Sequence, residues 1–217
     1  IRTMTYQEII KDIKAKNYKP IYFLHGKEAY FIDKVVDYVE NNILSDAEKG
    51  FNQSVIYGKE ADPKTVIDTA SRYPMMSPLQ VVLLKEAQDM KGFDLLKPYF
   101  DHPVKTTILV ISYKHKAFNK FNTKFGKSVK ANSVVLDSKP LYDNKIPDWI
   151  SSYLKSKKLT IKPKSAALIG EYLGTSLSKI SNELDKLALN LPTGSEVTDD
   201  AIEENIGISK EYNVFEF

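Results

Sequence analysis

The sequence predicts an α/β fold, with a mostly parallel β-sheet covered by helices on both faces, followed by a smaller, all-helical domain. Short apolar runs rich in Val and Ile recur along about the first 140 residues, and segments of helical period separate them. This alternation favours a parallel sheet, because each crossover helix brings the chain back to the same end of the sheet. After about Lys139 the apolar runs stop, and only helical periodicity remains.

The expected strands are five apolar runs. The first, IYFLHG, has the unbroken apolar character that is typical of a strand buried on both faces. The other four runs are SVIYG, QVVLLKEA, TTILVISY and NSVVLDS.

The helices expected between these strands show capping residues or a single apolar face. A capping box at Thr5 and Glu8 predicts a helix before the first strand. The apolar face of the next helix consists of Ala29, Ile32, Val35, Val36 and Val39. Two further helical segments are expected over residues 63–73 and 94–100.

The second domain is expected to contain four short helices. Their sequences are IPDWISSYLKS, KPKSAALIGEYLG, TSLSKISNELDKLALNL and TDDAIEENIG, most of them with Pro near the start or Gly at the end. We therefore place the two domains at residues 1–140 and 141–211. Residues 212–217 begin another amphipathic segment and are expected to start a third, truncated domain.

Composition excludes several classes of site. The 217 residues carry a formal net charge of +3, which does not indicate a general nucleic-acid-coating protein. The chain has no Cys, so thiolate catalysis and sulfur-based zinc sites are excluded, and its three scattered His residues show no metal-ligand spacing.

No apolar run approaches the roughly 20 residues that span a bilayer. We therefore expect no membrane partner and a cytoplasmic location.

The turn after the first strand has the topology of a phosphate-binding loop but lacks its chemistry. A Walker A loop has a glycine, four residues, and then Gly-Lys-Ser/Thr, which together bind phosphate and magnesium. Counting from Gly26, these last three places hold Phe31, Ile32 and Asp33. An apolar side chain therefore replaces the lysine, and a carboxylate replaces the hydroxyl.

The second half of an ATPase site is altered as well. Such a site needs an acidic pair at the end of a buried strand to hold magnesium, but the strand VVLLKEA ends in Lys85 and Glu86. A lysine at this place would repel the metal ion. We therefore expect no catalytic residue, no metal and no cofactor. A nucleotide-dependent ATPase with an atypical site is the competing enzyme hypothesis.

A lysine-rich stretch follows the strand TTILVISY. Its lysines include Lys116, Lys120 and Lys124, and its aromatic residues are Phe118, Phe121 and Phe125. The spacing of the rings predicts that they share one face of a helix. One interpretation is a DNA-binding groove, or a whole nucleic-acid-binding module, in which bases stack on the rings. The other interpretation is a surface helix whose rings pack on the sheet and whose lysines are solvated.

The stretch RYPMMSPLQ, between an expected helix and an expected strand, is unusual for a connecting loop. Pro74 and Pro78 restrict its backbone, and Met75 and Met76 stand where polar residues are common. Methionine suits partner grooves because its side chain is flexible and polarisable. The alternative interpretation is a helix end that is packed under its own strand, with both methionines in the core.

Features along nearly the whole chain resemble those of bacterial DNA polymerase III delta subunits, the clamp-opening subunits of the sliding-clamp loader. The matching stretches are PIYFLHGKEAYFID, FNQSVIYGKEAD, YPMMSPLQVVLLKEAQ, TTILVISYKHKAF, ISNELDKLAL and EYNVFEF. The resemblance implies an AAA+-like P-loop NTPase fold with a helical lid domain, and neither binding nor hydrolysis of ATP. It also implies a C-terminal collar domain, of which only the start, from about Tyr212, is present here.

The resemblance further implies partners and binding residues. In the family, a hydrophobic pair at the tip between a helix and a strand inserts into the ring-shaped β clamp. The matching pair here is Met75 and Met76, flanked by Pro74 and Ser77, whereas some relatives have Leu-Phe. Other implied partners are the gamma/tau and delta prime subunits, through the collar, and DNA in the assembled complex. The leading hypothesis is therefore a non-catalytic clamp-loader subunit that binds and opens the clamp during DNA replication.

Overall fold

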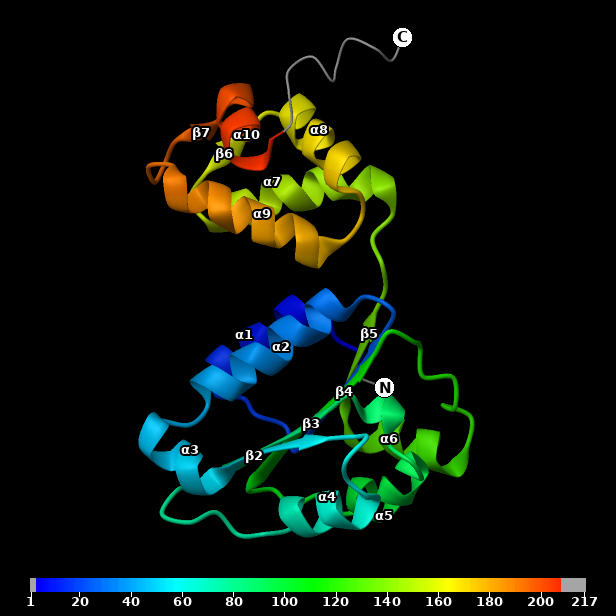
Figure 1. Cartoon of the computed structure of the whole chain (residues 1–217). Helices are drawn as coiled ribbons and strands as arrows, with labels where there is room; N and C mark the ends of the chain where they lie inside the picture. Colours follow the sequence, from blue (N-terminus) through cyan, green and yellow to red (C-terminus); the bar gives the residue numbers. More distant parts are fainter. Residues whose placement is uncertain (1–2, 208–217) are drawn as a thin grey trace. The chain divides into compact units, whose positions relative to one another are not determined.

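The computed structural model describes residues 3–207. The chain divides into two compact units, residues 1–139 and 140–217. The first unit is an α/β structure and the second consists mainly of helices (Figure 1). None of the helices in the described chain has the length and apolar character that a membrane crossing needs.

The first unit is built on a five-stranded parallel sheet, as the sequence predicts. The strands are β1 (Ile21–Gly26), β2 (Gln53–Tyr57), β3 (Gln80–Lys85), β4 (Thr107–Lys114) and β5 (Val134–Ser138). Their order is β2-β3-β4-β1-β5, and every neighbouring pair is parallel. All residues of β1 are buried, which agrees with its unbroken apolar run.

Helices cover both faces of this sheet, so the predicted two-sided architecture is confirmed (Figure 1). One face carries α1 (Tyr6–Lys14) and α2 (Ala29–Asn42), and the other carries α4 (Pro63–Ala70), α5 (Lys97–Asp101) and α6 (Lys124–Asn132). Alternate residues of β1 enter the two cores. Tyr22 and Leu24 pack on the side of α2, while Ile21 and Phe23 pack on the opposite side.

Helix starts follow the local sequence signals. Thr5 and Glu8 form the predicted capping box of α1. The helix predicted over residues 94–100 is divided between a 3-10 turn, η2 (Phe93–Leu96), and α5. Another 3-10 turn, η1 (Ala87–Asp89), follows β3.

A short helix before β2, α3 (Asp46–Asn52), has no counterpart among the predicted helices. Ser45 and Glu48 form a capping box at its start, a signal that is present in the sequence as S-D-A-E. The helix ends with Phe51, which is exposed, and Asn52, which is buried.

The predicted single helix of the lysine-rich stretch is wrong. α6 begins only at Lys124, and Thr123 caps it by accepting the N–H of Gly126 (3.0 Å). The preceding loop packs closely on the start of this helix, because a Cβ atom on Gly126 would lie 2.0 Å from the Lys120 carbonyl oxygen. Phe118 therefore reaches the core from a loop rather than from a helix face.

The second unit contains the four predicted helices. They are α7 (Ile146–Ser156), α8 (Pro163–Leu173), α9 (Leu177–Asn190) and α10 (Asp199–Ile206), with a 3-10 turn, η3 (Asp143–Lys145), before α7. One feature departs from the all-helical prediction, since β6 (Thr160–Ile161) pairs in parallel with β7 (Glu196–Val197). Strands of two residues leave no periodic pattern in a sequence. The expected start of a third domain at residues 212–217 lies outside the described residues.

Candidate functional site

The turn after β1 is short for a phosphate-binding loop. β1 ends at Gly26 and α2 begins at Ala29, so only Lys27 and Glu28 connect them. A Walker A loop uses several residues between strand and helix, because their N–H groups surround the phosphates. Here the places of the motif's Gly-Lys-Ser/Thr fall inside α2, at residues 31–33.

The end of β5 packs directly against this turn. Gly26 has a φ of 143°, and a Cβ atom at this position would lie 1.9 Å from the carbonyl oxygen of Ser138. The same carbonyl accepts the N–H of Glu28 at 3.2 Å, and the Ser138 hydroxyl donates to the Glu28 carbonyl at 2.6 Å. The close backbone approach that glycine permits therefore closes the turn onto β5.

A carboxylate already occupies the N-terminus of α2. Oε1 of Glu28 accepts the backbone N–H of Tyr30 at 2.9 Å. In nucleotide-binding proteins this end of the helix attracts phosphate. Burial raises the pKa of the Glu28 carboxyl, the Tyr30 N–H lowers it, and the nearby Asp33 carboxylate raises it. A phosphate at this place would displace Glu28 and meet the negative charge of Asp33.

Each of the three residues in the motif positions has a structural partner. Phe31 stacks on Tyr6 with ring centroids 4.7 Å apart. Ile32 is fully buried in the core beside α1. Asp33 forms an ion pair with Lys114 at the end of β4, at 3.0 Å. These residues therefore pack α2 against its neighbours.

At the strand end where an ATPase has its metal-binding acidic residue, this protein has an ion pair between two of its own side chains. Lys85, the last residue of β3, lies 2.7 Å from the carboxylate of Glu40 on α2. Glu86 follows with a φ of 55°, and its N–H donates to the Ser112 hydroxyl at 3.4 Å. Among residues 3–207, no group of three or more acidic, His or Cys side chains is placed to hold a metal ion.

The methionine tip, defined here as residues 71–79 between α4 and β3, exposes the two methionines. Met75 is 61% exposed and Met76 is fully exposed at 103%. The interpretation that places both side chains in the core is therefore wrong. Pro74 and Ser77 on either side are half-buried.

The backbone of the methionine tip is held by α3. Asn52, which is 3% exposed, accepts the N–H of Met75 through Oδ1 at 2.6 Å. Its Nδ2 donates to the carbonyl of Met75 at 2.9 Å. The hydroxyl of Ser77 donates to the carbonyl of Leu79 at 3.0 Å. The exposed pair thus stands on a backbone with defined hydrogen bonds.

Buried polar side chains of the sheet hold the start of the methionine tip. Nε2 of Gln80 lies 2.6 Å from the carbonyl of Arg72 and 3.2 Å from that of Ala70. The Thr107 hydroxyl donates to the Ala70 carbonyl at 2.8 Å. Carbonyl groups at a helix C-terminus lack partners within the helix. These donors satisfy the end of α4 where the chain leaves it.

Only some of the lysines in the lysine-rich stretch lie close together in the structure. Lys116 and Lys120 line one cavity of about 360 Å³, whose lining does not include Lys124. The Lys116 ammonium lies 5.5 Å from the centroid of the Tyr113 ring and 3.3 Å from the Gln88 carbonyl.

The aromatic rings of the lysine-rich stretch pack against other aromatic residues of the protein. Phe118 packs edge-on against Phe121 with centroids 4.9 Å apart, and against Phe23 of β1 at 5.1 Å. Phe125 is buried beside Phe100 at 5.4 Å. The interpretation in which these rings pack on the sheet is supported, and a free stacking face made of all three is excluded.

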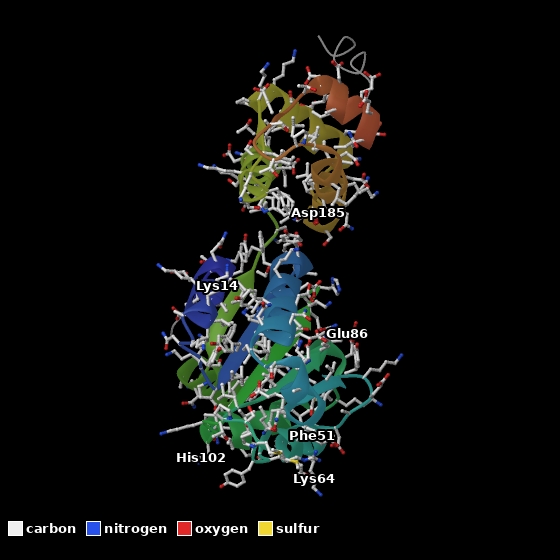
Figure 2. All side chains as sticks on the ribbon, turned by 90° about the vertical axis from the view of Figure 1, so that its left-hand side faces the viewer. Lys14, Phe51, Lys64, Glu86, His102 and Asp185 are labelled. Carbon is white, nitrogen blue, oxygen red and sulfur yellow. The ribbon has the colours of Figure 1, made fainter. Side chains whose placement is uncertain are left out.

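The prediction from sequence missed Asn52, the residue of α3 that holds the backbone of the methionine tip. The capping box of that helix was an available signal, whereas nothing in the sequence indicates that Asn52 bonds a residue 23 positions later. In Figure 2, Phe51 and Lys64 of α4 lie toward the same end of the first unit, and Lys14 of α1 lies toward the other.

The strand order and the turn after β1 define an AAA+-like α/β protein whose phosphate loop is replaced by a closed turn. The family described as "DNA polymerase III, delta subunit" matches residues 22–139, more than half of the chain. The chain therefore belongs to the DNA polymerase III delta subunit family.

Individual relatives agree with this assignment. DNA polymerase III subunit delta of Bacillus subtilis (strain 168) is 24% identical over 220 residues, which cover 96% of this chain and 63% of that protein. The chain thus spans less than two thirds of the length of this curated relative.

Solved structures show the same fold. The Bacillus subtilis DNA clamp loader delta protein superposes with a TM-score of 0.76 at 23% identity, covering 97% of this chain and 65% of that one. The Thermotoga maritima RuvB Holliday junction branch migration motor gives a TM-score of 0.50 at 7% identity, with 93% and 66% coverage.

Proposed function

We propose that this chain is the clamp-contacting part of a clamp-loader delta subunit, which binds and opens the sliding clamp for loading onto primed DNA without catalysis of its own. The observation that carries the proposal is the exposure of Met75 and Met76 on a backbone held by buried side chains. Membership of the delta subunit family supports the choice of partner.

An exposed apolar pair of this kind supplies much of the affinity of a small interface. Burying one methionine side chain gains roughly 1.5 to 3 kcal/mol, so two contribute about 3 to 6 kcal/mol. Binding energy is commonly concentrated in a few residues near the centre of an interface. Because the backbone of the methionine tip is already ordered, little conformational entropy is lost on binding.

Titration of the chain with the β sliding clamp of the same organism tests the proposal. The parent is expected to bind, and Met75→Ala/Met76→Ala to bind at least about tenfold more weakly, equal to about 1.4 kcal/mol. Leu95→Ala is the matched control, because Leu95 of the first unit is 63% exposed, close to the 61% of Met75. Equal affinity of the parent and the double variant would exclude the methionine tip as the clamp contact.

The further partners of the proposed subunit follow from the family. We expect contacts with the gamma/tau and delta prime subunits through a C-terminal collar domain, and with DNA in the assembled complex. The role places the protein in the cytoplasm with the replication machinery. The closed turn at Gly26 supports a subunit without nucleotide binding, so ATP-dependent steps would fall to other subunits.

DNA contact by the lysine-rich stretch is a second candidate function. Lys116, Lys120 and Lys124 are exposed, and the first two share a cavity with the half-buried rings of Phe93 and Tyr113. Lysines around an aromatic surface suit a single strand, whose phosphates need positive charge and whose bases stack on rings.

A further inference from the structure

We infer that Asn52 is a positioning residue of the clamp contact, which holds Met75 and Met76 in the conformation that enters the partner. The inference rests on the proposed function. Asn52 is the last residue of α3 and is buried although it is polar. A buried asparagine needs hydrogen-bond partners, and Asn52 finds them in the backbone of the methionine tip.

The Asn52 amide uses both of its polar atoms on one residue. Oδ1 accepts the Met75 N–H at 2.6 Å, and Nδ2 donates to the Met75 carbonyl at 2.9 Å. Nδ2 also lies 3.2 Å from the carbonyl of Glu48 in the same helix, which fixes the direction of the amide plane. A side-chain amide both donates and accepts, so it satisfies the two backbone groups together.

The hydrogen bonds of Asn52 hold Met75, and the next residue, Met76, has an uncommon backbone conformation. Met76 has a φ of 53°, in the left-handed region that residues other than Gly seldom adopt. Such conformations persist where the surrounding structure holds them. Met75 is held by Asn52 on one side, and Ser77 bonds the backbone of Leu79 on the other. Without Asn52 we expect Met76 to relax, and the two side chains to lose their fixed relative direction.

The path of the chain also brings the methionine tip alongside α3. Figure 1 shows the segment between α4 and β3 running past α3. The hydrogen bonds that join α3 to the methionine tip are those of Asn52 to the backbone of Met75.

Clamp affinity of Asn52→Ala, measured in the parent and in Met76→Ala, tests the inference. In the parent we expect about a tenfold loss, equal to about 1.4 kcal/mol. In the Met76→Ala background the loss of affinity should be clearly smaller, because substitutions at residues that act through one another do not have additive effects. An equal loss in both backgrounds would show that Asn52 acts through general stability and would overturn the inference.

Asn42→Ala is the matched control. The Asn42 amide also bonds a backbone carbonyl, that of Tyr38 at 2.9 Å, but it lies on α2. This variant should leave clamp affinity unchanged. If Met75→Ala/Met76→Ala weakens binding while Asn52→Ala does not, only the role of Asn52 is refuted. If the double methionine variant binds like the parent, the proposed clamp contact itself fails.

Amide hydrogen exchange in the parent provides a test that depends on no variant. The Met75 N–H should exchange at least about tenfold more slowly than that of Met76, because a hydrogen-bonded amide exchanges only on local opening. Within the described chain, Asn52 accepts the Met75 N–H, and the Met76 N–H has no acceptor. Equal and unprotected rates at both residues would contradict the inference.

Discussion

Asn52 binds both the N–H and the carbonyl of Met75, a residue 23 positions further along the chain, at 2.6 and 2.9 Å. A buried side chain thus holds the backbone of a residue whose own side chain is in solvent. The methionine tip therefore combines a hydrogen-bonded backbone with exposed apolar side chains. This combination is expected of a partner contact, since a fixed apolar surface binds with a small entropic cost.

The stability of Met75→Ala/Met76→Ala should stay close to that of the parent. Both side chains are exposed, so their removal should change the unfolding free energy by no more than about 0.5 kcal/mol. Met90→Ala, by contrast, truncates a buried methionine of the core and should cost about 2 to 5 kcal/mol. Urea unfolding of both variants is the measurement. If the double variant lost as much unfolding free energy as Met90→Ala, the exposure of Met75 and Met76 would be contradicted.

Calorimetry with Mg-ATP should show no binding at physiological nucleotide concentrations. The turn after Gly26 is closed by Ser138, and the Glu28 carboxylate occupies the helix end where phosphate would bind. A micromolar dissociation constant would contradict this prediction. So would phosphate release that disappears on Glu86→Gln.

Gly26→Ala and Gly50→Ala should have opposite effects on stability. A Cβ atom on Gly26 would overlap the backbone of Ser138 at 1.9 Å, so we expect a loss of roughly 3 kcal/mol or more. Gly50 lies within α3 with nothing within 4 Å of a new Cβ atom, so alanine should stabilise the protein by about 0.5 to 1 kcal/mol. Thermal unfolding measures both. A well-tolerated Gly26→Ala would show that the turn opens easily.

The unfolding free energy should fall as the pH drops below about 6.5, partly because of His25. Burial lowers the pKa of His25 from its usual 6.5, the Asp137 carboxylate raises it, and Lys139 lowers it. Nδ1 of the neutral ring accepts the N–H of Phe118 at 3.3 Å. Between the lowered pKa and 6.5 the unfolded chain binds the proton more readily, so stability present above 6.5 is lost on acidification.

Unfolding of the parent and of His25→Asn between about pH 5.5 and 7.5 measures this effect. An asparagine oxygen accepts the Phe118 N–H without titrating in this range. The variant should therefore show a flatter dependence on pH than the parent. Identical slopes would mean that other groups cause the change.

Charge reversal at two lysines tests the DNA contact. Lys116→Glu/Lys120→Glu should weaken binding to single-stranded DNA. The slope of log affinity against log salt concentration should fall by about 0.7 for each phosphate that is no longer neutralised. Lys59→Glu/Lys64→Glu makes the same change at exposed lysines outside the cavity that Lys116 and Lys120 line. An equal effect of the two pairs would indicate a response to net charge alone, and would count against DNA binding at Lys116 and Lys120.

Residue identity and local periodicity were enough to predict the strands, most of the helices and the loss of the Walker A chemistry. These features depend on residue identity and on periodicity over a few neighbouring positions, as in the run of β1 or the capping box of α1. The absence of a lysine at residue 32 needs no coordinates to recognise.

Which side chains are exposed to solvent follows from the tertiary structure and could not be predicted from the sequence. The backbone of the exposed Met75 is held by Asn52, 23 residues away, and the turn at Glu28 is closed by Ser138, 110 residues away. The same holds for Phe118, whose ring enters the core beside Phe23. Burial is a property of all the segments that meet at one place, and local periodicity carries no information about segments so distant in the chain.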